Sequence, residues 1–188
     1  MKDIFIVLKV TLIGLLVAVF FYPLIHESGH IIATLLTGGK FISMAWLPAP
    51  NVLCEVDSTN NAALAITSLA GMMFPMLLIL PFYKSKGSLR FGVLIFNAVT
   101  VLSMIIGLSV IILRMFGTIT PNDDITAFID FTGWLLPTLF ILIGLTTITI
   151  LQFILLKPKQ TFMAILGIQS EQKQLEYQHS HPLNIENI

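Results

Sequence analysis

The chain of 188 residues is 56% hydrophobic and only 11% charged, and its formal net charge is zero. Soluble domains carry about 25% charged residues, so this composition excludes an ordinary soluble domain and predicts an integral membrane protein. The chain has neither a basic patch nor an acidic run, and we therefore expect no nucleic-acid partner. Cys54 is the only cysteine, which excludes an intrachain disulfide and a metal site built on paired cysteines.

Four apolar segments are each long enough to cross a hydrocarbon core, which takes about 20 helical residues. We expect these spans at about 4–36, 62–82, 89–115 and 131–156. The first is longer than a straight crossing needs, and Pro23 predicts a kink in it. It is also too long for a signal peptide and has no small-residue cleavage motif before the polar residues near its end, so we expect it to be retained.

The connection between the first two spans has the pattern of a small β-hairpin. Residues 41–47 are apolar and β-prone, 48–51 have turn chemistry, and 52–56 form a returning strand. Such a hairpin either offers its edge to an extended peptide or serves packing alone. The predicted fold class is therefore an all-α integral membrane protein with about four transmembrane helices and a small β-hairpin after the first.

The distribution of Lys and Arg predicts the orientation of the spans. If both termini are cytoplasmic, only Lys40 and Arg114 lie on the outer side. The other eight cations then lie on the cytoplasmic side: Lys2, Lys9, Lys84, Lys86, Arg90, Lys157, Lys159 and Lys173. This bias predicts a multi-pass protein with both termini cytoplasmic. The connections 38–61 and 116–130 then lie outside.

Residues 157–188 are more polar than the rest of the chain, and Pro158 follows the last span. We expect a polar cytoplasmic tail that is partly disordered, with a weakly amphipathic patch at 162–168. The sequence thus divides into a transmembrane domain, 1–156, and the tail, 157–188.

The most informative motif lies near the end of the first span, where His26 and His30 flank Glu27. Residues four apart share one face of a helix, so both imidazoles can bind a single ion, and Glu27 is placed to act as general base on an activated water. Ionisable side chains at membrane depth are costly and point to function. The alternative is a hydrogen-bonded polar cluster with only a structural role.

A catalytic zinc usually takes three protein ligands, so a third donor is needed. Asp123 and Asp124 precede the fourth span on the same outer side as the two histidines, and either can be the ligand while the other only caps a helix. Glu55 and Asp57 are also on that side, and Asp130 lies nearer the fourth span.

Small and polar residues mark the second and third spans. Ser68, Ala70 and Gly71 predict that the second helix approaches the first closely. Asn97 lies within the third span. It either forms an interhelical hydrogen bond or contacts a substrate backbone or the site water.

Several of these segments resemble those of a known family. The motif at 26–30, followed by Gly-Gly-Lys-Phe-Ile at 38–42, resembles the site-2 protease family of intramembrane zinc metalloproteases. Residues 68–71 are similar to that family's Ala-Gly-Pro segment, and 122–133 are similar to a shorter, bacterial B-type branch. Counting back from the Thr-Gly pair that closes this last stretch, the resemblance implies Asp124 as the third ligand.

The resemblance implies an enzyme, a metalloendopeptidase that holds one Zn²⁺ per chain and uses Glu27 as general base. Its partners would be the lipid bilayer and membrane-embedded or membrane-proximal protein or peptide substrates, in a bacterial cell membrane. Such a substrate would unwind locally, for example onto the 41–47 strand. Two alternatives stay open: a membrane metal-binding or transport protein without hydrolysis, and a catalytically silent relative.

Overall fold

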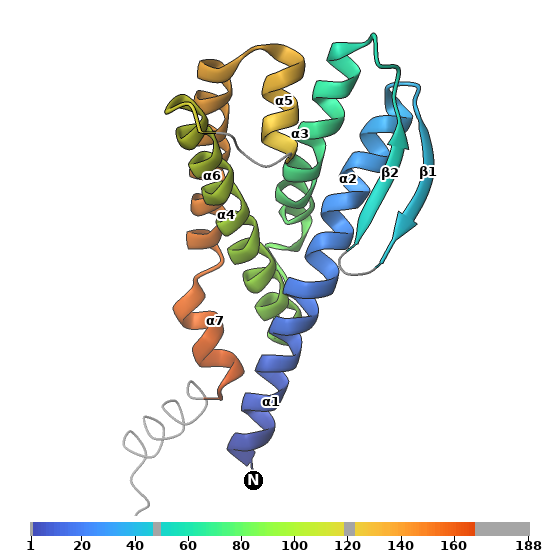
Figure 1. The fold of residues 1–188 in the computed structure, drawn as a ribbon. Coiled ribbons are helices and arrows are strands. Elements are labelled where there is room, and N and C mark those ends of the chain that lie inside the picture. The colour runs from blue at the N-terminus through green and yellow to red at the C-terminus, as the bar shows by residue number, and fades with distance from the viewer. Residues whose placement is uncertain (1, 47–49, 119–122, 168–188) are drawn as a thin grey trace, which may run out of the picture.

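A bundle of helices, with a two-stranded sheet packed beside one end of it, makes up the fold of this computed structural model (Figure 1). The structure describes residues 2–46, 50–118 and 123–167. In chain order the elements are α1 (Lys2–Leu15), η1 (Leu16–Phe21), α2 (Tyr22–Leu36), β1 (Lys40–Ala45), β2 (Asn51–Glu55), α3 (Asn61–Leu78), η2 (Leu80–Phe82), α4 (Gly87–Met115), α5 (Asp124–Thr132), α6 (Leu135–Leu155) and α7 (Pro158–Ile165).

The prediction of a mainly helical chain with four apolar spans is confirmed. Among the described residues, four helical stretches are long and apolar enough to cross a membrane: Ile4–Leu36, Asn61–Phe82, Gly87–Met115 and Leu135–Leu155. The start of the chain and α7 lie near the same end of the bundle (Figure 1).

The first span is continuous but not regular. Its middle part, η1, is a π-helical turn that ends directly before α2, and Pro23 occupies the first turn of α2. A proline has no N–H and its ring crowds the carbonyl four residues earlier, and a wider helical turn accommodates both effects. The expected distortion at Pro23 therefore takes the form of this wider turn, just before the histidine motif.

The fourth span starts later than predicted, because a separate helix precedes it. Helix α5 ends at Gly133, whose φ of 69° is the left-handed conformation typical of a glycine that stops a helix. Helix α6 then begins at Leu135, not near residue 131. The short α5 packs along α3 (Figure 1), which brings the residues before the last span into the bundle.

The largest apolar cluster joins α5 to three of the spans. Met72 of α3, Met104 of α4 and Leu142 of α6 are almost completely buried together with Ile125 and Ile129 of α5. Helix α5 is therefore anchored by its own apolar face, and its first residue has a fixed position relative to α3.

Asn97 belongs to a buried interhelical hydrogen-bond network, which confirms the simpler of its two interpretations. Its side-chain amide donates to Oε1 of Gln152 at 3.4 Å, and the Gln152 amide donates to the Met76 carbonyl oxygen at 3.4 Å. Three spans, α3, α4 and α6, are linked through these two side chains. The role that the structure shows for Asn97 is therefore to hold helices together.

The predicted hairpin is confirmed with slightly shifted bounds. β1 pairs with β2 in antiparallel register, and a bulge interrupts the pairing between Phe41 and Ser43. Trp46, at the end of β1, stacks on Phe20 of η1 with ring centroids 5.9 Å apart. Residues 47–49, which include most of the expected turn, lie outside the described residues.

Part of the predicted tail is structured. Residues 158–165 form α7, which packs on α4, where the rings of Phe91 and Phe162 meet edge to face at 5.2 Å. The amphipathic patch expected at 162–168 thus lies largely within a docked helix. Residues 168–188 are outside the described residues, so the division at residue 157 stays a prediction.

Candidate metal centre

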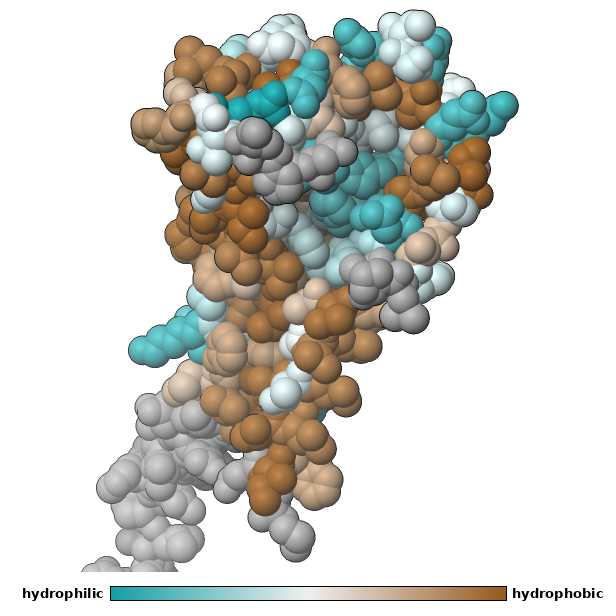
Figure 2. Space-filling model, viewed as in Figure 1, coloured by the Kyte–Doolittle hydropathy of each residue, from teal (hydrophilic) through white to brown (hydrophobic). Residues whose placement is uncertain are grey.

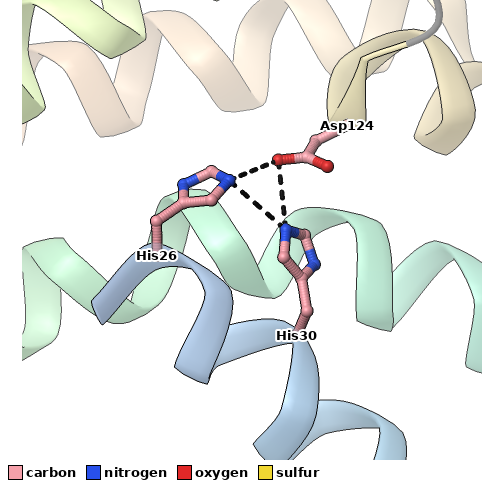
Figure 3. Close-up of side chains that lie close together, drawn as sticks. All are labelled: His26, His30 and Asp124. Carbon is pink, nitrogen blue, oxygen red and sulfur yellow. Dashed lines mark hydrogen bonds and ion pairs between the residues drawn. The ribbon is translucent and has the colours of Figure 1, made fainter. Parts of the chain in front are cut away.

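Helix α2 presents His26 and His30 on one face, one turn apart, as their spacing predicts. Their ring centroids lie 5.0 Å apart and their Nε2 atoms 3.3 Å apart. Both rings point toward α5 (Figure 3).

Asp124, the first residue of α5, meets both imidazoles. Its Oδ2 atom lies 2.9 Å from Nε2 of His26 and 3.3 Å from Nε2 of His30. The side chain of His26 is 19% exposed, that of His30 12% and that of Asp124 30%, so the cluster is largely shielded from solvent but still accessible. Figure 3 shows the three donor atoms facing one another.

The structure separates the two neighbouring aspartates by role. Asp123 is the N-cap of α5, where its Oδ1 atom accepts a hydrogen bond from the Thr126 backbone N–H at 2.7 Å. Its neighbour Asp124 is thereby left to face the histidines. Of the other carboxylates considered, Asp130 pairs with Arg114, and Asp57 accepts hydrogen bonds from Thr59 in the connection before α3.

A hydrogen bond from outside the cluster fixes the tautomer of His30. Its Nδ1 atom lies 2.7 Å from the Thr67 carbonyl oxygen on α3. A carbonyl can only accept, so Nδ1 must carry the proton, and in the neutral ring Nε2 then has a free lone pair directed at the cluster. Histidine ligands of metals commonly donate their second N–H in this way.

Two glycines permit this arrangement. A Cβ atom on Gly71 of α3 would collide with Nε2 of His30 and would lie 2.9 Å from Cε1 of His26. A Cβ atom on Gly29 would lie 2.5 Å from the Ala70 carbonyl oxygen. The close approach predicted for the small residues of the second span is therefore confirmed, and Gly71 leaves the space that the imidazoles occupy.

The spacing of the donors fits a metal ion. Zinc holds nitrogen and oxygen ligands at about 2.0–2.1 Å, so two ligands of a tetrahedral site lie about 3.3–3.4 Å apart. The three donor atoms here form a triangle with sides of 2.9, 3.3 and 3.3 Å. His26, His30 and Asp124 could therefore hold one ion and leave a fourth position open.

The electrostatics of the cluster also favour a bound cation. Without a metal, burial opposes ionisation of Asp124, but hydrogen bonds from protonated Nε2 atoms of His26 and His30 outweigh that cost and hold the pKa of its carboxyl well below its usual range. Two ring nitrogens cannot face each other at 3.3 Å beside a carboxylate without a proton or a cation between them. A divalent cation satisfies all three donors at once.

Glu27 lies beside the cluster and is held by the hairpin. Its Oε2 atom accepts a hydrogen bond from the backbone N–H of Val52 in β2 at 3.1 Å. His26, His30 and Asp124 are close enough to act on it electrostatically. This role of Val52 could not be predicted from the sequence, because almost every residue has a backbone N–H.

A cleft of about 550 Å³ lies between the hairpin, α3 and α5. It is lined in part by Leu53 and Cys54 of β2, by Thr67, which is the partner of His30, and by Phe131 of α5. The end of the molecule that carries the hairpin and α5 is also its more hydrophilic end, as Figure 2 shows for one face. The cleft reaches the cluster through Thr67, whose carbonyl oxygen contacts Nδ1 of His30.

Comparison with known proteins gives no match: no family model fits the sequence, and no curated protein or solved structure is similar enough to count as one. Function is therefore inferred from the residues and geometry of this chain.

Proposed function

We propose that this chain is an intramembrane zinc metalloendopeptidase that hydrolyses peptide bonds of membrane-embedded or membrane-proximal proteins. The observation that carries the proposal is the triangle of donors from His26, His30 and Asp124, with Glu27 next to it. A purely structural polar cluster would not need three donors at the spacing of zinc ligands and a further carboxylate beside them.

When bound, zinc would lower the pKa of water and polarise the scissile carbonyl. Glu27 supplies the proton transfer: it takes a proton from the attacking water and delivers it to the leaving amine. The hydrogen bond from Val52 occupies Oε2 and orients the carboxylate, which leaves Oε1 for the proton. His30 is kept in its binding tautomer by Thr67.

The substrate must be extended where it is cut, because a helical segment hides its amides in internal hydrogen bonds. The strand in contact with Glu27 is β2, not the 41–47 strand suggested by the sequence. The N–H of Val52 points away from β1, and the cleft beside β2 leads to Thr67. We therefore place the substrate backbone in this cleft beside β2.

The test compares wild type, Glu27→Gln and His26→Ala in detergent. Zinc content is measured for each, together with cleavage of a pool of single-span membrane peptides, followed by mass spectrometry of the fragments. Glu27→Gln should keep its zinc and lose about 10²- to 10⁴-fold in rate, because it lacks only the proton acceptor. His26→Ala should lose both.

Other outcomes identify the alternatives. Cleavage by Glu27→Gln at the wild-type rate would rule out the general-base role. Zinc without cleavage in wild type would favour a non-hydrolytic metal-binding or transport protein. Wild type with neither zinc nor cleavage would favour a catalytically silent relative.

A further inference from the structure

An apolar pocket of about 310 Å³ opens on the surface of the bundle. It lies between η1, the start of α2, the end of α3 and the start of α4, and every residue that lines it is apolar. Phe21, Phe82 and Leu89 at its rim are 42%, 40% and 58% exposed. In a chain whose spans cross a bilayer, such a pocket faces acyl chains.

Gly92 keeps this pocket open. Its missing side chain faces η1, where an added Cβ atom would be 3.8 Å from a methyl of Val17. A larger side chain at this position would therefore fill the pocket. From Leu89 to Phe96 the pocket follows eight residues of α4, a rise of about 10 Å. The hydrocarbon core of one bilayer leaflet is about 15 Å thick, so the pocket is long enough for much of an acyl chain.

The two walls formed by α3 and α4 are joined by a short turn that carries charge. Phe82 and Leu89 border the pocket on either side of this turn, and Lys84 and Lys86 within it are exposed. The Ser85 hydroxyl has no hydrogen-bond partner among the described residues. Residues 79–96 and 150–167 contain five cations and neither Asp nor Glu: Lys84, Lys86, Arg90, Lys157 and Lys159.

We infer that this pocket binds an anionic phospholipid, with an acyl chain between η1, α3 and α4 and the phosphate at Lys84 and Lys86. The apolar lining selects a hydrocarbon chain, and the cations of the adjoining segment 79–96, which has neither Asp nor Glu, select a negative headgroup. The inference is independent of the proposed hydrolysis, since the pocket contains none of its residues.

The experiment is native mass spectrometry of the full chain in detergent with equimolar dioleoyl phosphatidylglycerol and dioleoyl phosphatidylcholine. Wild type should retain one phosphatidylglycerol with at least tenfold preference. Lys84→Gln with Lys86→Gln should lose that preference, since each lysine near an anionic surface contributes about fivefold in affinity, equivalent to about 1 kcal/mol. Lys40→Gln, at the other end of the molecule, is the charge control.

The pocket itself is tested with Gly92→Leu, which should retain at least tenfold less phosphatidylglycerol. Gly144→Leu, at a position with no atom within 4 Å, is the matched control and should behave as wild type. Equal retention of both lipids by wild type would overturn the inference. A mass spectrum that shows a dimer of the chain without bound lipid would also overturn it. If Gly92→Leu does not fold, the exposed lysine pair still decides the question.

Discussion

At the residue scale, the two histidines and Glu27 could be identified from sequence because their relationship is local. A spacing of four residues fixes their geometry as soon as the segment is helical. The third donor could not be fixed in this way, because Asp123 and Asp124 are adjacent and chemically identical. The fold decides between them through a capping hydrogen bond, which uses Asp123 and leaves Asp124 to face the imidazoles.

Gly71 supplies a residue-scale prediction. Gly71→Ala should weaken zinc binding by about 10- to 100-fold, because the added methyl would collide with Nε2 of His30 and displace both imidazoles. Gly144→Ala, on a helix surface with open space around it, is the matched control. Both variants are measured by titration with a competing zinc chelator. An unchanged affinity in Gly71→Ala would show that the ligands do not sit where the structure has them.

At the scale of elements, the four spans followed from apolar length alone, and the hairpin from its turn chemistry. Helix α5 is not predicted as a separate helix: most of it lies in the expected connection 116–130, and its last two residues lie in the expected fourth span, although its stop signal, Gly133, is visible in the sequence. Residues 131–156 contain no charged residue, and their length gives no reason to divide them. The position of α5 against α3 depends on the burial of Ile125 and Ile129, which are distant in sequence from their contacts.

The hairpin supplies a prediction about how an element orients a catalytic group. Val52→Pro removes the N–H that binds Glu27, and Val52→Ala keeps it. Val52→Pro should retain zinc and lower kcat by about 10- to 100-fold, because the carboxylate is no longer held, whereas Val52→Ala should stay close to wild type. Zinc content and steady-state kinetics of peptide cleavage are the measurements. Equal kcat values for the two variants would exclude this role of β2.

At the scale of the whole molecule, the fold groups the connecting segments at the two ends of the bundle in the way that the charge analysis assumed. The turn between α3 and α4 and the start of α7 lie at the end of the bundle where the first span begins, and the hairpin and α5 lie at the other (Figure 1). The number of predicted spans accounts for this arrangement, because each successive span reverses the direction of the chain; which end is cytoplasmic stays a prediction from charge. Contacts between α2, α3 and α5 could not be predicted, since they depend on side-chain packing across the bundle.

Cys54 allows the orientation to be tested, since it is the only cysteine and lies half-buried in β2. A membrane-impermeant maleimide should label it in intact bacterial cells expressing the protein, because the hairpin is predicted outside. The companion variant Cys54→Ser with Gln160→Cys places an exposed thiol in α7 and should react only after the membrane is opened. The reverse pattern would place the metal centre toward the cytoplasm.

The most direct measurement of the metal centre is the zinc content per chain of Asp124→Ala beside Asp123→Ala and wild type, by elemental analysis of purified protein. Wild type should hold one zinc per chain. Asp123→Ala should keep that zinc, with a loss of about 1 kcal/mol in stability from its missing cap, whereas Asp124→Ala should lose most of it. Full zinc occupancy in Asp124→Ala, or none in wild type, would contradict the three-ligand site.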